Sequence, residues 1–367
     1  MKERVKRLRK LLAERELAGL ILRVNESGQS TQPNNQNVLY LSGFGGSTAV
    51  LLVTRKRCFI IADARYWSRA KLEAPDFRLV KVKRGEKFSN FINEALALAK
   101  LPESSKVGFE ADRVPFSVAE EWKKNLSVKL EPVEMLVESL RQYKDALEIK
   151  HLRSACRKTC SVYREIEALV RPGMKEVELA LEIDSRLRQH GATDNSFQTI
   201  VASGPNSAIP HHATGQRKLR AGEPVVMDFG GVFAGGYCSD ITRTVFVPGR
   251  EPDAQMKEIY KVVLEANRRA RLALTPAMTI VDYDRVARDY IESRGFGKYF
   301  THGLGHSLGL EAHDPFDYKN SSLDVGTVVT DEPGIYIEGV GGVRIEDDLL
   351  VTANGAVKLT SAPYWRF

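Results

Sequence analysis

The stretch that decides the fold is Val225-Val-Met-Asp-Phe-Gly-Gly-Val-Phe-Ala-Gly-Gly-Tyr-Cys-Ser-Asp240, two apolar segments around a glycine-rich reversal. Asp228 and Asp240 are twelve residues apart, so they face each other if the chain reverses near Ala234. The even separation keeps both side chains on one face, because side chains alternate along a strand. The sequence therefore predicts two facing carboxylates in an apolar hairpin.

A second hairpin repeats this arrangement between residues 328 and 346. Glu332 and Glu346 are fourteen residues apart and are opposed if the turn centres on Gly339. Like charges directly opposite one another destabilise a sheet, and buried carboxylates are costly without a cation between them. Salt bridges to Arg243 or Arg344 could explain one such pair. Two pairs favour a cation site over that alternative.

Histidines complete the predicted site. The chain has seven, and five of them fall in Pro210-His-His212 and in residues 301–313. Glycines at 303, 305 and 309 disfavour a helix, so we expect an extended chain on which His302, Leu304 and His306 share one face. Four carboxylates and one imidazole suit a pair of Mn²⁺ or similar divalent ions better than a structural Zn²⁺.

Outside these hairpins, the pattern of strand and helix signals predicts two domains. Residues 1–140 alternate short apolar strands with amphipathic helices, as in an α/β domain. Residues 141–367 read as two helices followed by β-rich sequence, twice, which indicates an internal structural duplication. The first helix pair is expected at 145–170 and up to 191. The second is expected at 252–274 and 279–294.

Composition excludes several classes of protein. The chain has 367 residues, of which 43% are hydrophobic, so it is globular and long enough for two domains. Residues 1–140 carry a net charge of +8 and residues 141–367 a net charge of −1. The basic residues are scattered without interleaved aromatic residues, so we expect no nucleic-acid partner. No apolar stretch approaches the roughly 20 residues of a membrane span.

Two further features bear on where the protein works. The charged N-terminus lacks the apolar core of a signal peptide, and four cysteines are too few for a disulfide framework in so long a chain. We therefore expect a cytoplasmic protein that does not bind membranes. Cys156 and Cys160, four residues apart, are expected to be small residues on a packed helix.

Five ordered strings carry a family resemblance: Met-Asp228-Phe-Gly-Gly, Ser-Asp240-Ile-Thr-Arg-Thr, His302-Gly-Leu-Gly-His306, Glu332-Pro-Gly-Ile-Tyr336 and Arg344-Ile-Glu346-Asp-Asp. They resemble the M24-type family of Xaa-Pro aminopeptidases and prolidases, which are dinuclear metallopeptidases. Upstream, Asn37-Val-Leu-Tyr-Leu-Ser-Gly-Phe44 and Ile61-Ala-Asp-Ala-Arg-Tyr66 resemble the creatinase-type N-terminal domain. The resemblance implies an α/β N-terminal domain at 1–140. It also implies an α+β pita-bread (creatinase/aminopeptidase) catalytic domain at 141–367.

The resemblance also assigns roles to individual residues. Asp240 and Glu346 would bridge the two ions, His211 and His313 would contact the substrate carbonyl, and Glu332 would also move the proton. His302 and Arg344 would lie around the substrate, whereas His212 receives no role and could be structural or part of the site. The implied metal ligands are Asp228, Asp240, His306, Glu332 and Glu346.

The activity expected from the resemblance is hydrolysis of the Xaa-Pro bond at the N-terminus of peptides by an Xaa-Pro aminopeptidase. The string Asp63-Ala-Arg65-Tyr66 favours that activity, because it looks more like bacterial aminopeptidase P relatives. The alternatives are an Xaa-Pro dipeptidase (prolidase) and, outside the enzymes, a metal-free pita-bread binding module. The expected cofactors are two Mn²⁺ ions, with Co²⁺ or Zn²⁺ possible, and the expected assembly is a homodimer.

One departure from the resemblance is Asp331, where many relatives carry an apolar residue. It should point to the face opposite Glu332, where a partner such as Arg or Ser would have to satisfy its carboxylate.

Overall fold

The computed structural model describes residues 1–24 and 35–366. The chain divides into two compact units, Met1–Leu140 and Arg141–Phe367. None of the described helices is long and apolar enough to cross a lipid bilayer. All four cysteines are free thiols, and Cys156 and Cys160 are buried on one helix, as predicted.

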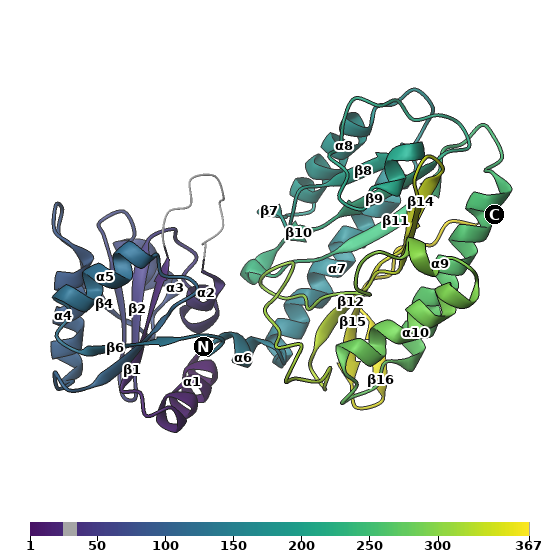
Figure 1. Ribbon diagram of the computed structural model, residues 1–367. Helices are drawn as coiled ribbons and strands as arrows, with labels where there is room; N and C mark the ends of the chain where they lie inside the picture. Colours follow the sequence, from purple (N-terminus) through teal and green to yellow (C-terminus); the bar gives the residue numbers. More distant parts are fainter. Residues whose placement is uncertain (25–34, 367) are drawn as a thin grey trace. The chain divides into compact units, whose positions relative to one another are not determined.

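The first unit is built on a mixed six-stranded sheet with the order β4-β3-β2-β1-β5-β6 (Figure 1). Its apolar segments form the central strands, and every residue of β2 is buried. Aliphatic and aromatic side chains of α4 and α5 pack on the sheet in one hydrophobic cluster. The strands are β1 (Gly19–Val24), β2 (Ala49–Thr54), β3 (Cys58–Ala62), β4 (Arg78–Lys81), β5 (Lys106–Glu110) and β6 (Lys129–Val133). The helices are α1 (Lys2–Glu14), α2 (Gln36–Ser42), α3 (Trp67–Glu73), α4 (Phe88–Ala99), α5 (Phe116–Asn125) and α6 (Glu138–Arg141).

A buried acidic pair lies in this first unit. The amide nitrogens of Asn35 and Asn37 donate to the two oxygens of Glu110 at 2.5 and 2.6 Å, and Asn37 also donates to Glu138 at 2.5 Å. Arg113 pairs with Glu138 at 2.9 Å. Burial, with the neighbouring Glu138 charge, raises the pKa of Glu110 to about 7. The ionised form of Glu110 is therefore disfavoured in the folded protein.

Glu110→Gln is expected to flatten the pH dependence of stability. A carboxyl whose pKa is raised by folding contributes stability below its ordinary pKa of 4.5. That contribution is lost as the pH rises through about 7, and the loss approaches about 3 kcal/mol. Urea unfolding of the full metal-free chain at pH 5 and pH 8 measures the difference. Glu131→Gln on β6 is the control, and equal pH slopes in wild type and Glu110→Gln would contradict the prediction.

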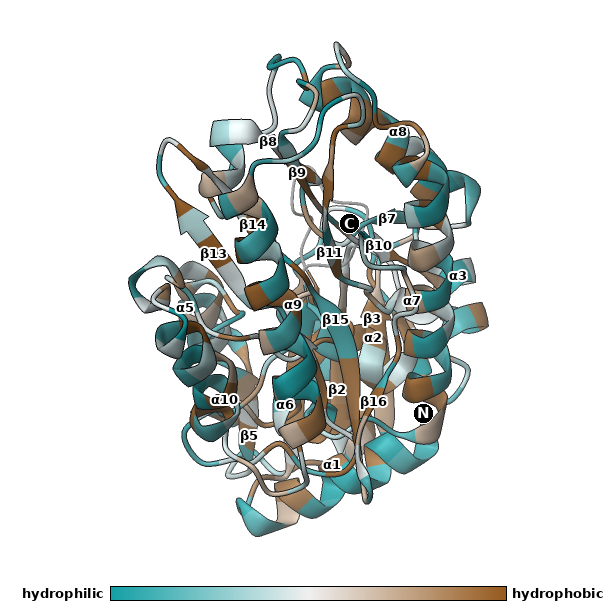
Figure 2. Ribbon diagram, turned by 90° about the vertical axis from the view of Figure 1, so that its right-hand side faces the viewer, coloured by the Kyte–Doolittle hydropathy of each residue, from teal (hydrophilic) through white to brown (hydrophobic). Residues whose placement is uncertain are grey.

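The second unit follows the predicted order of two helices then strands, twice (Figure 1). Its helices α7 to α10 are amphipathic, and Figure 2 shows hydrophobic residues along strands such as β9 and β11. The helices are α7 (Ala146–Glu167), α8 (Glu176–Gln189), α9 (Ala254–Ala273) and α10 (Ile280–Ser293). The strands are β7 (Asp194–Asn195), β8 (Ile200–Ser203), β9 (Pro224–Phe229), β10 (Gly231–Val232), β11 (Ile241–Phe246), β12 (Val328–Asp331), β13 (Gly334–Ile337), β14 (Gly341–Arg344), β15 (Asp347–Thr352) and β16 (Gly355–Lys358). Short 3₁₀ turns are η1 (Gly204–Ala208), η2 (Ala234–Gly236) and η3 (Gly297–Tyr299).

Each half of this unit packs its helix pair on its own strands. Side chains of α7 and α8 form one hydrophobic cluster with β9 and β11, and those of α9 and α10 form a second with β12 to β15. The Asp145 side chain begins α7 by accepting from the backbone nitrogens of Leu147 and Glu148. The Glu148 side chain accepts in return from the Asp145 backbone nitrogen at 3.0 Å, which completes a capping box. The two clusters hold the strands from which the acidic side chains project.

The first hairpin differs from the prediction by one position in its turn. Asp228 of β9 lies opposite Thr242 of β11, so the reversal centres on Gly235, at φ +81°, and not on Ala234. Asp240 is therefore a diagonal neighbour of Asp228, and the prediction that the two face each other directly is wrong. The reversal includes η2, where Gly235 adopts the left-handed conformation at low cost.

The second hairpin has the predicted centre. The β13–β14 and β12–β15 ladders share one register about Gly339, whose φ is +75°. Glu332 and Glu346 lie between the two ladders, in opposed positions. Their backbone nitrogens donate instead to the carbonyls of Leu304 and Thr242, at 2.8 and 3.0 Å.

Candidate active site

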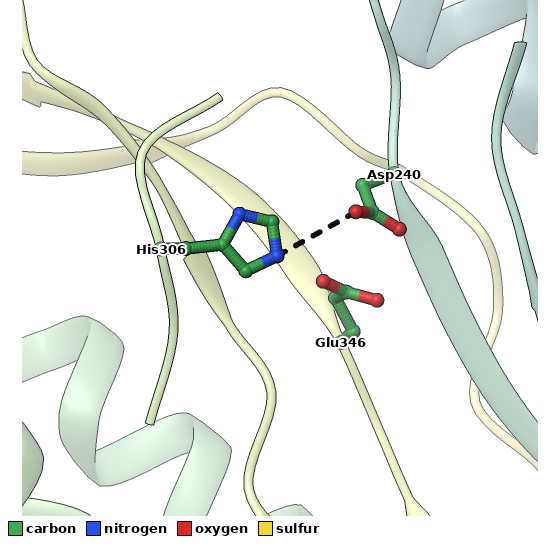
Figure 3. A group of neighbouring side chains, drawn as sticks. All are labelled: Asp240, His306 and Glu346. Carbon is green, nitrogen blue, oxygen red and sulfur yellow. Dashed lines mark ion pairs between the residues drawn. The ribbon is translucent and has the colours of Figure 1, made fainter. Parts of the chain in front are cut away.

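Three side chains from separate segments converge beside β11 and β14. Asp240 precedes β11, His306 comes from the loop before β12, and Glu346 follows β14 (Figure 3). One ligand atom from each lies within 4.8 Å of the others, and His306 Nε2 is 3.7 Å from Asp240 Oδ2. Two carboxylates and an imidazole at this spacing could hold a metal ion.

Two more carboxylates extend this group. Glu332 Oε1 lies 3.4 Å from His306 Nε2. Asp228 lines one cavity together with Asp240, His306, Glu332 and Glu346. Among the described residues, Asp228 Oδ1 and Asp240 Oδ1 are buried without a hydrogen-bond partner. Such orphaned acceptors are costly unless a ligand satisfies them. The donor set therefore fits a cation on an observation independent of any resemblance.

The electrostatics of the acidic residues agree with that fit. Burial, then the charge of Glu346, raises the pKa of Asp240 well above its usual range. Burial, then Glu332, does the same to the pKa of Glu346. Burial also raises the pKa of Glu332 to about 8, although the Arg344 guanidinium opposes it. Without a cation, these groups resist ionising together.

The histidines are poised to stay neutral. Burial lowers the pKa of both His302 and His306 to about 4, so each ring keeps a lone pair at neutral pH. The His306 ring stacks on that of His313, with centroids 3.8 Å apart. The expectation that Leu304 shares a face with the two histidines is wrong, because Leu304 packs in the hydrophobic cluster of α9 and α10. The chain twists between the glycines and is not a regular strand there.

A cavity of about 500 Å³ brings every predicted site residue together. It also has apolar lining that the sequence analysis did not find, at Phe197 and Ile200. These two side chains lie in and before β8, where no charged motif marks them. The predicted residues that line the cavity are His211, Asp228, Asp240, His302, His306, His313, Glu332, Arg344 and Glu346.

A hydrogen-bond chain connects Asp228 with His302. Arg344 Nη2 donates to Asp228 Oδ2 at 2.6 Å, and Arg344 Nη1 donates to the Tyr336 hydroxyl at 2.9 Å. His302 Nδ1 must donate to the Gly303 carbonyl at 2.8 Å, so the Tyr336 hydroxyl donates to His302 Nε2, also at 2.8 Å. The sequence analysis missed Tyr336, although it ends the string Glu332-Pro-Gly-Ile-Tyr336.

Tyr336→Phe is expected to lower kcat/KM about 10-fold or more while the chain stays folded. The change removes one hydroxyl, so His302 Nε2 loses its donor and Arg344 Nη1 loses its acceptor at 2.9 Å. Arg344 Nη2 keeps its bond to Asp228, and the loss resembles the deletion of a supporting contact of a metal site. Steady-state kinetics with thermal unfolding measures both effects. Tyr299→Phe, on a half-buried ring outside the cavity, is the control. Wild-type kinetics for Tyr336→Phe would show that the hydrogen bonds of the Tyr336 hydroxyl do not contribute to activity.

Asp331 lies on the other side of its strand, as predicted, and is fully buried. The expectation of an Arg or Ser partner is wrong: among the described residues, neither carboxylate oxygen has a hydrogen-bond partner. Its backbone carbonyl accepts from Asn267 Nδ2 at 2.9 Å. Burial, then the charge of Asp347, raises the pKa of Asp331 well above its usual range.

The fold and the site together define a two-domain hydrolase of the pita-bread fold with an acidic centre suited to metal. The chain belongs to metallopeptidase family M24, whose model matches residues 150–353. The Creatinase/Prolidase N-terminal domain matches residues 4–143. The protein is therefore a metallopeptidase with a creatinase-type N-terminal domain.

Individual relatives indicate which M24 peptidases this chain is similar to. The Xaa-Pro dipeptidase of Pyrococcus furiosus is 34% identical over 98% of both chains. The structure of an Xaa-Pro dipeptidase from Bacillus anthracis is 36% identical, with a TM-score of 0.90 over 99% of this chain and 98% of that one. The structure of an X-Pro aminopeptidase from Thermotoga maritima is 31% identical, with a TM-score of 0.87 over 99% of both chains. Peptidases whose names specify Xaa-Pro bonds thus match along nearly the whole chain.

Proposed function

We propose that the protein is an Xaa-Pro dipeptidase (prolidase) that works with two divalent metal ions. The single observation that carries the proposal is the joining of two carboxylate pairs and the neutral His306 in one cavity with orphaned acceptors. Relatives at 34% identity and a structure at 36% identity carry the name Xaa-Pro dipeptidase, which supports this activity over the Xaa-Pro aminopeptidase expected from the sequence.

The proposed metal ligands are the five residues that the family resemblance implies, and Asp240 and Glu346 would be shared between the two ions. Four carboxylates would balance the charge of two divalent ions, and oxygen-rich sites suit Mn²⁺. When bound, a pair of ions supplies an activated water nucleophile and polarises the substrate carbonyl. The ligands are Asp228, Asp240, His306, Glu332 and Glu346.

The remaining side chains bind and orient the peptide in this proposal. His211 and His313 donate hydrogen bonds to the carbonyl oxygen as negative charge develops on it. Glu332 takes a proton on a carboxylate oxygen and delivers it to the leaving nitrogen. A proline nitrogen has no N–H in the amide, so the shape of the cavity beside Phe197 and Ile200 supplies much of the discrimination.

The substrate length gives a direct test. In Mn²⁺, we expect Ala-Pro to be hydrolysed with a kcat/KM at least about 10-fold above that of Ala-Pro-Ala. Loss of a single contact worth about 1.4 kcal/mol in the transition state would produce this difference. Pro-Ala, which lacks an Xaa-Pro bond, is the control. Faster cleavage of the tripeptide would overturn the dipeptidase in favour of the aminopeptidase. Reconstituted protein that cleaves no peptide would favour the binding module.

The assembly proposed with this function is a homodimer, as the family resemblance implies. Light scattering of the metal-loaded protein tests it, and a mass of one chain, 41.0 kDa, would contradict it.

A further inference from the structure

The edge of the active-site cavity includes a segment without regular structure, residues 209–213. Four of its members, Pro210, His211, His212 and Ala213, line the cavity beside the acidic centre. It follows the short turn η1, and the His211 side chain is exposed. A group that must meet one carbonyl oxygen from such a segment needs its main chain held from outside.

A buried carboxylate holds the stretch from Ser203 to His212, which includes most of this segment, at both of its ends. Glu176, the first residue of α8, has a side chain with no exposed surface. At the near end, Glu176 Oε1 accepts from Ser203 N and Ser203 Oγ, both at 2.7 Å. At the far end, Glu176 Oε2 lies 3.0 Å from His212 Nε2. Asn206 Nδ2 donates to both oxygens, at 3.0 and 3.2 Å.

The donors around Glu176 keep it charged. Burial alone would raise its pKa, but the hydrogen bonds from Ser203 and His212 hold the pKa below its usual range. Arg217 supports the same arrangement by donating to Ser203 Oγ at 2.7 Å while it pairs with Glu223 at 2.7 Å. The carboxylate is thus a fixed anchor on a helix end, and the helix is packed in the core of the unit.

His211 lies between two anchored neighbours. On one side, the Pro210 carbonyl accepts from Arg344 Nη1 at 3.4 Å. On the other side, His212 is held by Glu176. The main chain of His211 is therefore held on one side by Arg344 and on the other side by Glu176.

We propose that Glu176 is a positioning residue that acts through His212 to set the place of His211 at the reacting carbonyl. This inference rests on the proposed function only for the role of His211. The anchoring of the segment rests on the contacts of Glu176 with Ser203 and His212. It also assigns His212 a supporting role, which the sequence left open.

A double-mutant cycle with His211 tests the inference. Glu176→Ala is expected to lower kcat at least about 10-fold with KM within about 2-fold, because a misplacement of about 1 Å at a reacting group costs up to about 10²-fold. In a His211→Ala background, the same change should cost less than about 2-fold, since the group that it positions is already gone. His212→Phe should behave like Glu176→Ala, and Glu176→Gln, which keeps an acceptor for Ser203, should recover part of the rate.

A matched control lies on the same helix end. Glu178 accepts from the Lys175 backbone nitrogen at 2.9 Å and not from Ser203, Asn206 or His212, so Glu178→Gln should keep wild-type kcat. Metal content should be unchanged in every variant, because Glu176 contacts none of the proposed ligands. Equal losses from Glu176→Ala in both backgrounds would overturn the inference, as would wild-type kcat in Glu176→Ala and His212→Phe.

Amide hydrogen exchange gives a readout that does not depend on activity. Peptides covering 203–213 should exchange faster in Glu176→Ala and in His212→Phe, while peptides covering 225–246 should not change. Unchanged exchange at 203–213 would overturn the anchoring. If Glu176→Ala does not fold, His212→Phe replaces it in both the double-mutant cycle and the exchange measurement. A wild type that cleaves some other peptide but no Xaa-Pro dipeptide would overturn the proposed function alone, and the cycle would be run with that peptide.

Discussion

Glu346→Gln is expected to abolish metal binding and hydrolysis while making the metal-free protein more stable to heat. Glu346 is buried among like charges, and its raised pKa means that ionising it costs free energy in the folded state. Above pH 4.5, the carboxylate is charged in the unfolded chain, so the neutral amide removes a penalty that only folding incurs. Gln can still accept from Thr242 Oγ1, which lies 2.8 Å from Glu346 Oε2.

Glu346→Gln should cause a large loss of activity and metal binding, but a gain in stability of the metal-free protein. Loss of a shared ligand should lower kcat/KM at least about 10³-fold, and calorimetric titration with Mn²⁺ should no longer give two ions per chain. The thermal midpoint without metal should rise, and the further rise on adding Mn²⁺ should vanish. Glu338→Gln, exposed at the tip of the same hairpin, is the control. Two-ion binding by Glu346→Gln at wild-type affinity would contradict the assignment of ligands.

The second large effect is expected from Arg243→Met on folding. Arg243 is fully buried in β11 and pairs with Asp347 at 2.8 Å. Its guanidinium also donates to the carbonyls of Ala362 and Pro363, at 3.0 and 3.2 Å, and to that of Glu346. Arg243→Met breaks this buried ion pair and removes the donor of three carbonyls, while Asp347 keeps Lys358 Nζ at 3.1 Å. The expected cost is therefore about 3 kcal/mol, at the lower end of the range for breaking a buried pair.

Urea unfolding of the metal-free chain measures that cost. Arg164→Met is the matched control, because Arg164 also reaches the C-terminal segment, donating to the Ser361 carbonyl at 2.8 Å, but from an exposed position. We expect the control to change the free energy of unfolding by less than about 1 kcal/mol. If Arg243→Met costs no more than the control, Arg243 does not hold the strands together.

Much of the site could be predicted because alternation along strands is strict. Glu332 and Glu346 are opposed about Gly339 as their spacing requires, since the turn there inserts no extra residue into the ladders. The first hairpin differs by one position because η2 takes up part of its glycine-rich reversal. Spacing gives the face of a side chain, but the exact partner depends on turn geometry that several glycines leave open.

Other parts of the site depend on tertiary contacts that no local pattern encodes. Leu304 turns into the core because glycines on both sides let the chain twist, so alternation fails there. Tyr336 and Glu176 have ordinary sequence surroundings, a strand and a helix start, and only the folded chain brings them to His302 and His212. Local patterns find the charged groups, whereas the residues that hold them become visible only in three dimensions.

The most direct test of the central claim is anomalous diffraction from crystals of the protein grown with Mn²⁺. We expect two anomalous peaks about 3.5–4 Å apart, both enclosed by the five proposed ligands. Asp240 and Glu346 should contact both peaks, and His306 should contact one. A single peak, or peaks bound outside this group of side chains, would contradict the dinuclear site.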